Sequence, residues 1–135
     1  MVLADSNIMI DYFRSRDSDL AKKIDTMDIG LCGTVRAEVI HGARSDYEID
    51  NYLEAFKTFD FLINDDYDWE GTGFILQTLR ANGVAVPFAD ALIAFTAMKY
   101  DIPLWTRDTH FLLIQAYYPE LKLYDEVIAQ TPSYR

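Results

Sequence analysis

Short apolar runs alternate along the chain with longer segments in which apolar residues recur every three or four positions. The runs predict strands near residues 2–4, 29–32, 61–63, 103–105 and 121–124. The periodic segments predict helices near residues 6–13, 17–27, 34–42, 46–59, 65–82, 90–98 and 110–114. Because strands alternate with helices, we expect a mostly parallel sheet with helices on both faces. The predicted fold class is therefore α/β, with the helices and the sheet forming an α/β/α sandwich.

Local signals predict how several helices begin and which residues they bury. Asp5 or Ser6 can cap the first helix, and Thr34 is expected to cap the helix that ends near Gly42. The acidic stretch at residues 65–68 is interpreted as negative charge that complements the positive end of the helix it opens. In the helix predicted at 46–59, the residues expected to face inward are Ile49, Tyr52, Leu53, Phe56 and Phe59.

The composition indicates one folded domain over residues 1–135. Half of the residues are hydrophobic and 14% are aromatic, which is enough for a packed core. No apolar window approaches the roughly 18 residues of a membrane span, and the charge of Asp5 precedes any signal-peptide core. The single Cys32 lies in an apolar run, so a buried strand residue is expected rather than a nucleophile. A cytoplasmic protein fits these features.

The net charge of −10 bears on the choice of partner, because a nucleic-acid-binding surface is normally basic. Some of the 22 acidic residues would no longer act as free surface charge if they bound metal ions, but acids would still outnumber the 12 Lys and Arg residues. Any nucleic acid must therefore be held by a local patch together with bound metal.

Four acidic residues lie at positions where an α/β domain brings distant carboxylates together. They are Asp5, Glu38, Asp90 and Asp108, each at a strand end or early in a predicted helix. Ligands of parallel sheets bind beyond the carboxyl ends of the strands, so Asp5 and Asp108 share a crevice if their strands are neighbours. Oxygen ligands without clustered His or Cys favour Mg²⁺ or Mn²⁺, the ions that most often serve phosphodiester hydrolysis. By position alone, ordinary helix caps remain the alternative.

The sequence around each of these acids resembles a motif of the PIN-domain family, in particular its small VapC-type toxin ribonucleases. The four matching segments occur in the family's order and span most of the chain: Val2-Leu3-Ala4-Asp5-Ser6-Asn7, Thr34-Val35-Arg36-Ala37-Glu38-Val39-Ile40-His41-Gly42, Phe88-Ala89-Asp90-Ala91-Leu92-Ile93-Ala94 and Leu104-Trp105-Thr106-Arg107-Asp108-Thr109-His110-Phe111.

This resemblance implies a metal-dependent endoribonuclease that is the toxin of a type II toxin–antitoxin pair. Its acidic site, binding Mg²⁺ or Mn²⁺, would consist of Asp5, Glu38, Asp90 and Asp108. Ser6 and Thr106 would orient a carboxylate or a water, and Asn7 also matches the motif. The partners implied are an RNA substrate, a cognate antitoxin and a second copy of the chain in a homodimer. We further expect an antitoxin arginine to pair with the carboxylates and displace the metal.

Alternative interpretations remain for the function and for several residues. A PIN-like module that only binds proteins would agree with the acidic charge. His41 and His110 fit no zinc motif, so a structural role is expected for both. Trp69 and Trp105 are expected in the core. Five basic residues near the motifs could contact phosphate, although an ion-paired or solvated role is expected more often: Arg14, Arg16, Arg36, Lys99 and Arg107.

Overall fold

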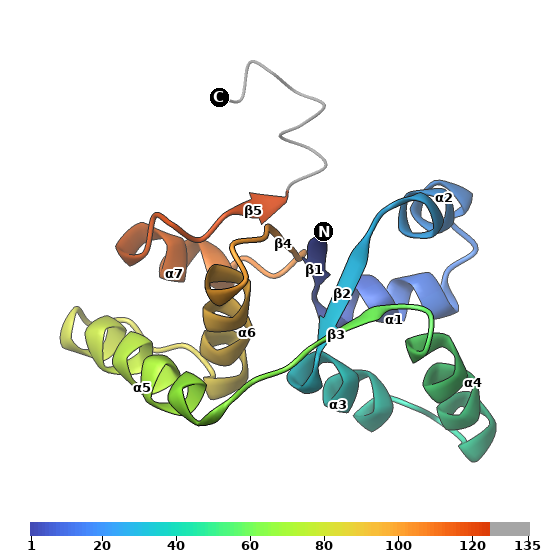
Figure 1. Cartoon of the computed structure of the whole chain (residues 1–135), viewed down its shortest axis with the longest axis horizontal. Coiled ribbons are helices and arrows are strands. Elements are labelled where there is room, and N and C mark those ends of the chain that lie inside the picture. Colours follow the sequence, from blue (N-terminus) through green and yellow to red (C-terminus); the bar gives the residue numbers. More distant parts are fainter. Residues whose placement is uncertain (125–135) are drawn as a thin grey trace.

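The computed structural model of the chain describes residues 1–124. Its sheet contains five strands, all parallel, in the order β3-β2-β1-β4-β5 (Figure 1). The strands are β1 (Val2–Ala4), β2 (Ile29–Cys32), β3 (Asp60–Leu62), β4 (Leu104–Trp105) and β5 (Leu123–Tyr124). Each coincides with a predicted strand to within one or two residues at its ends. The predicted domain also includes residues 125–135, which lie outside the described residues.

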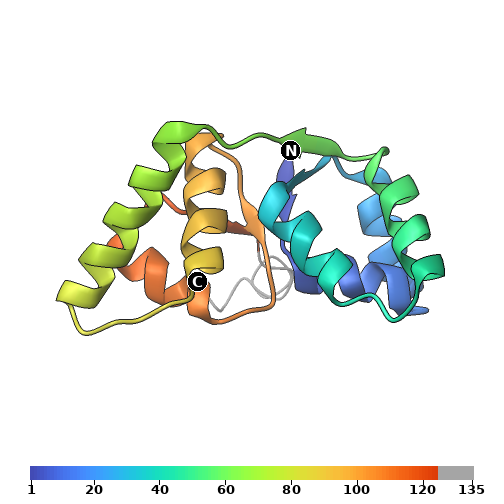
Figure 2. The same ribbon diagram turned by 90° about the horizontal axis from the view of Figure 1, so that it is seen from below.

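Helices cover both faces of the sheet, which confirms the predicted α/β class. They are α1 (Ser6–Arg14), α2 (Ser18–Thr26), α3 (Gly33–His41), α4 (Asp46–Phe56), α5 (Asp66–Ala81), α6 (Phe88–Lys99) and α7 (His110–Tyr117). Figures 1 and 2 show α1 to α4 on one side of the strands and α5 to α7 on the other. Within residues 1–124, none of these helices has the length and apolar character needed to cross a membrane.

Two sets of chain connections diverge at the carboxyl end of β1. The chain runs from β1 outward to β2 and β3, then returns to β4 on the other side of β1. Since parallel crossovers are right-handed, this reversal places the two sets of helices on opposite faces. A ligand crevice forms where the strand order reverses in this way. The backbone N–H of Asp5 donates to the Trp105 carbonyl at 2.9 Å, so the ends of β1 and β4 meet there.

The core is continuous from the sheet into α6. β1, β2 and β4 are buried along their whole lengths, as expected for strands covered on both faces. In α6, the apolar residues from Ala91 to Ala94 and Ala97 are also buried. The helix α5 approaches α6 closely at Gly71, where an added Cβ would lie 2.1 Å from the Phe95 ring. Packing on several sides therefore fixes α6, and with it the position of Asp90.

Some local predictions were wrong. The helix α3 starts directly after β2, with Cys32 as its N-cap, so Thr34 already lies in the first turn and does not cap it. Leu53 was expected to face inward but is 47% exposed, because only Tyr52 and Phe56 of α4 turn their side chains into the core. Trp69 was expected in the core but is 50% exposed. For Leu53 and Trp69 the helix itself is predicted correctly, but the face that packs is decided by contacts distant in sequence.

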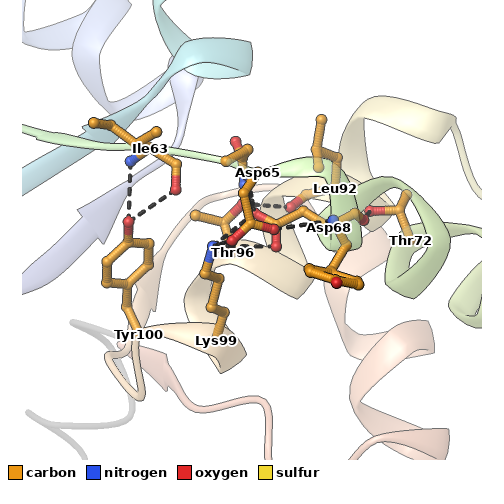
Figure 3. Close-up of polar contacts among 10 residues, drawn as sticks. Ile63, Asp65, Asp68, Thr72, Leu92, Thr96, Lys99 and Tyr100 are labelled. Carbon is orange, nitrogen blue, oxygen red and sulfur yellow. Dashed lines mark hydrogen bonds and ion pairs between the residues drawn. The ribbon is translucent and has the colours of Figure 1, made fainter.

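The acidic stretch at the start of α5 contains a buried ion pair that the sequence did not reveal. Asp65 and Asp68 form a capping box, as the predicted helix start requires. Asp68, however, is only 2% exposed, and its carboxylate accepts hydrogen bonds from Lys99 Nζ at 3.0 and 3.1 Å. Asn64 Nδ2 donates to the same carboxylate at 2.8 Å and to the Thr96 hydroxyl at 2.8 Å. Figure 3 shows these contacts joining the beginning of α5 to the end of α6.

Partners of this kind make a buried carboxylate stable in its charged form. Burial by itself raises the pKa of Asp68, but hydrogen bonds from Asn64 and Lys99 outweigh it and hold the pKa below its usual value. A lowered pKa in the folded state means that Asp68 stabilises the fold at neutral pH and that this contribution is lost as acid protonates it. The pair therefore acts as a structural link between the two helices.

We expect Lys99→Met to lower the free energy of unfolding by about 3 kcal/mol, because it leaves the Asp68 carboxylate buried without its cation. Asp68→Asn should cost less, about 1 kcal/mol, since Lys99 is 29% exposed and can reach water. Urea denaturation measures both values. The control is Lys57→Met, which breaks an exposed pair with Glu54 and should cost no more than about 0.5 kcal/mol. A Lys99→Met cost equal to the control would contradict a structural role for the pair.

Candidate functional site

The four predicted carboxylates come from four separate elements and lie near one another beyond the carboxyl end of β1. Asp5 directly follows β1, Glu38 lies in α3, Asp90 is in the first turn of α6, and Asp108 follows β4. They are close enough to interact electrostatically, because the charges of Asp5, Asp90 and Asp108 each raise the pKa of Glu38. The structure thus brings together residues that are up to about a hundred positions apart in the sequence.

Hydrogen bonds fix the Asp5 carboxylate at the N-terminus of α1. The side chain is 4% exposed and accepts from the Ser6 backbone N–H at 2.7 Å. The Thr106 hydroxyl donates to its Oδ2 at 2.7 Å, and the Asn7 amide donates to the same oxygen at 3.3 Å. Burial raises the pKa of Asp5, the Thr106 and Ser6 bonds lower it, and the net direction is upward. Thr106 therefore contacts Asp5 through its hydroxyl, as expected, and Asn7 through its amide, whereas the bond from Ser6 comes from its backbone N–H.

Thr106 and Asn7 also hold the loop that carries Asp108. The Thr106 Oγ1 accepts from the Asp108 backbone N–H at 3.0 Å while its proton bonds to Asp5. Asn7 Nδ2 donates to Thr106 Oγ1 at 3.4 Å, and its Oδ1 accepts from the Arg107 backbone N–H at 3.2 Å. The loop after β4 is thereby tied to the start of α1, which sets the position of Asp108 relative to Asp5.

Glu38 and Asp90 carry negative charge that the protein does not compensate fully. Burial raises the pKa of Glu38, and the charges of Asp5, Asp90 and Asp108 raise it further, while a hydrogen bond from the Ser6 side chain lowers it and the net direction is upward. Burial also raises the pKa of Asp90, together with the charges of Asp108 and Asp5, while a hydrogen bond from His110 opposes this. Within the described residues, the buried Glu38 Oε1 accepts no hydrogen bond. An acceptor of this kind, surrounded by like charges, is suited to a cation.

His110 lies at the site although the sequence indicated only a structural role for it. Its Nδ1 is 3.3 Å from Asp90 Oδ2 and 3.3 Å from Asp108 Oδ1. Its backbone N–H donates to Asp108 Oδ1 at 2.9 Å as α7 begins. The premise that no histidine clusters with the acids was therefore wrong. The available signal was its position two residues after Asp108, where a helix start turns the side chain back toward the preceding acid.

The donors present fit a divalent cation. Carboxylates from four elements supply the hard oxygen ligands that Mg²⁺ and Mn²⁺ take, and Glu38 Oε1 is buried and accepts no hydrogen bond from residues 1–124. The ligand atoms of Asp90, Asp108 and His110 all lie within 4.8 Å of one another. The fixed orientation of Asp5 through Thr106 is the kind of support that metal-binding carboxylates have in other proteins.

The basic residues near the motifs are largely engaged with the protein itself. Lys99 pairs with the acids at the start of α5, and Arg107 forms an ion pair with Asp11. The Arg36 guanidinium lies over the Phe61 ring, 4.1 Å from its centroid. Phosphate contacts by Arg14, Arg16, Arg36, Lys99 or Arg107 stay a prediction. The observed pairing agrees with the expectation that ion-paired roles are the more frequent ones.

Comparison with known proteins gives consistent results for sequence and structure. The model of the PIN domain matches residues 2–117. Ribonuclease VapC1 of Methanocaldococcus jannaschii is 29% identical over 127 residues, which cover 93% of this chain and 88% of that protein.

Two solved structures illustrate the likeness of fold. That of VapBC-1 from nontypeable Haemophilus influenzae has a TM-score of 0.76 at 20% identity and covers 93% of this chain and 98% of that one. A toxin-antitoxin complex from Klebsiella pneumoniae has a TM-score of 0.70 at 23% identity, covering 90% and 95%. At these identities the structural likeness establishes the fold and nothing more.

The raised pKa values predict how stability depends on pH in the absence of divalent ions. A carboxyl group whose pKa is raised by folding destabilises the native state when it is ionised, so acid relieves the penalty. We expect the free energy of unfolding to rise as the pH falls from neutral, until about pH 4, where these groups protonate in the unfolded chain too. Denaturation in EDTA across this range measures the effect.

Two variants separate this effect from the general acidity of the chain. Glu38→Gln removes one half-buried charge and should flatten the pH profile and stabilise the protein at neutral pH in EDTA. Asp50→Asn removes an exposed acid of α4 and should leave the profile unchanged. Mn²⁺ should stabilise the wild type more at pH 7.5 than at pH 5.5, because protons compete for the same oxygens. A Glu38→Gln profile identical to that of the wild type would argue against the predicted coupling.

Proposed function

The chain belongs to the PIN domain family, and from this we propose that it is a metal-dependent endoribonuclease that hydrolyses phosphodiester bonds in RNA. The main support for this proposal is the proximity of four carboxylates beyond the carboxyl end of β1. One of their oxygens, Glu38 Oε1, is buried and accepts no hydrogen bond from the described residues. The relative of 29% identity, which aligns over nearly the whole chain, is a ribonuclease by name and supports the same activity.

In this proposal Asp5, Glu38, Asp90 and Asp108 hold Mg²⁺ or Mn²⁺. A bound ion of this kind lowers the pKa of the attacking water and stabilises the negative charge that develops on the departing oxygen. The orientation of the Asp5 carboxylate is fixed by hydrogen bonds from Ser6, Asn7 and Thr106. Asp108 completes the site from a loop that Thr106 holds in place.

Water rather than a protein side chain is the nucleophile in this proposal. The single cysteine, Cys32, is fully buried, and burial raises the pKa of its thiol, which disfavours the reactive thiolate. Among the four carboxylates, the side chain of Asp108 is 34% exposed and faces solvent. The phosphodiester would therefore approach from the side of Asp108, and Asp5 would lie at the buried end of the site.

We also propose that the protein is the toxin of a type II toxin–antitoxin pair, with a cognate antitoxin as its partner. Two lines of similarity support this: the name VapC1 of the curated relative, and solved complexes of this fold that are described as toxin–antitoxin. A homodimer and a cytoplasmic location are part of the same proposal. The alternative, a protein-binding module without catalysis, is favoured by the acidic net charge of −10.

Cleavage of RNA by the purified protein tests the enzymatic proposal. We expect cleavage in the presence of Mg²⁺ or Mn²⁺, its loss in EDTA, and a drop of at least about 100-fold in Asp90→Asn, which removes a charged ligand while preserving shape. Asp50→Asn serves as the control, because it removes one exposed acid and should retain full activity. Cleavage that persists both in EDTA and in Asp90→Asn would refute the mechanism. Metal-independent folding without any cleavage would favour the binding module.

An antitoxin arginine can inhibit the enzyme by replacing the cation. A guanidinium pairs bidentately with carboxylates, and several carboxylates lie close together at this site. We expect Mn²⁺ binding to weaken at least about 10-fold when the antitoxin encoded beside this chain is bound, and an arginine-to-alanine change in the antitoxin to restore it. Calorimetry on the complex measures both. Unchanged Mn²⁺ affinity in the wild-type complex would rule out this mode of inhibition.

A further inference from the structure

His110 brings a nitrogen donor to a site whose other donors are carboxylate oxygens. We propose that His110 Nδ1 is a ligand of the metal site together with Asp90 and Asp108, and that it makes this position select Mn²⁺ over Mg²⁺. The inference rests on the proposed metal dependence and adds to it a ligand and an ion preference.

The distances suit one ion held by all three residues. His110 Nδ1 lies 3.3 Å from Asp90 Oδ2 and 3.3 Å from Asp108 Oδ1, and all three ligand atoms fall within 4.8 Å of one another. Around an octahedral ion with bonds of about 2.1 Å, adjacent ligand atoms are about 3.0 Å apart and opposite ones about 4.2 Å. The imidazole nitrogen is therefore spaced from each carboxylate as an adjacent ligand would be.

The surroundings of His110 hold it in place without burying it in the core. It is the first residue of α7, and its backbone N–H is bonded to Asp108. The next residue, Phe111, is fully buried and fixes the start of the helix against the sheet. The imidazole itself is 51% exposed. A side chain that is half in solvent contributes little to the core, so packing does not explain why its ring faces two carboxylates.

The chemistry of the donor set determines the ion preference. Mg²⁺ takes oxygen ligands and gives up its waters reluctantly, so a site made only of carboxylates distinguishes it poorly from Mn²⁺. Imidazole favours transition metals, for which affinity rises from Mn²⁺ upward along the series. One neutral nitrogen among carboxylates should therefore improve the binding of Mn²⁺ while contributing little to that of Mg²⁺.

Pulsed electron paramagnetic resonance on the protein with bound Mn²⁺ tests the ligand directly, without RNA or activity. A coordinated imidazole produces modulation from the ¹⁴N nucleus, which we expect in the wild type and in His41→Ala. His41 is an exposed histidine at the end of α3 and serves as the matched control. His110→Ala should lose the ¹⁴N modulation, and so should His110→Asp, in which an oxygen replaces the nitrogen.

Calorimetric titration with each ion separately tests the selectivity. We expect His110→Ala to weaken Mn²⁺ binding about 10-fold and to change Mg²⁺ binding less than about twofold. His110→Asp should bind Mg²⁺ at least as well as the wild type and should show a smaller Mn²⁺/Mg²⁺ affinity ratio. His41→Ala should match the wild type for both ions.

The possible results distinguish the proposed role of His110 from the proposed metal dependence on which it rests. Mn²⁺ that binds the wild type without ¹⁴N modulation would overturn the role of His110 and leave the carboxylate site standing. Equal losses of Mg²⁺ and Mn²⁺ affinity in His110→Ala would overturn the selectivity. Failure of the wild type to bind either ion would overturn both proposals. Because a wild-type spectrum without ¹⁴N modulation is enough to refute the role of His110, the proposal stays falsifiable even if a variant fails to fold.

Discussion

The parallel pairing of β1 with β2 on one side and with β4 on the other is the constraint from which the site follows. The connections on the two sides of β1 lie on opposite faces of the sheet, and ligands of such sheets bind beyond the carboxyl ends of the strands at this point. Asp5 ends β1, the loop with Thr106 and Asp108 follows β4, and α3 and α6 supply Glu38 and Asp90. A shift in this pairing would separate the four acids.

The protein contains buried and half-buried carboxylates of two kinds. Their different surroundings distinguish a structural ion pair from a candidate functional site. Asp68 has an internal cation in Lys99 and a lowered pKa, so the fold satisfies it completely. Asp5, Glu38 and Asp90 have raised pKa values, and the causes are burial first and then the charges of neighbouring acids, including Asp108. Keeping several such groups together is unfavourable for folding unless something positive joins them, which is why the crevice rather than the Asp68 pair is the candidate site.

An acidic protein that cleaves RNA needs a source of attraction other than a basic face. Lys99 and Arg107 are engaged with aspartates of the chain, and Arg36 lies over an aromatic ring. Bound divalent ions would supply positive charge at the point where the phosphate must lie, and their local charge is among the largest that a site can have. In the proposed mechanism the metal therefore contributes to substrate binding as well as to the chemistry.

The sequence by itself determined the strands, the helices and the identity of the four acids, because apolar periodicity and short motifs are local properties. It could not determine which face of a helix is buried, so Leu53 and Trp69 were misplaced. Nor could it show that Lys99 reaches Asp68, or that His110 turns toward Asp90, twenty residues away. Those contacts depend on how α5, α6 and α7 pack together. The tertiary structure alone therefore decided which charges are satisfied and which are left for a ligand.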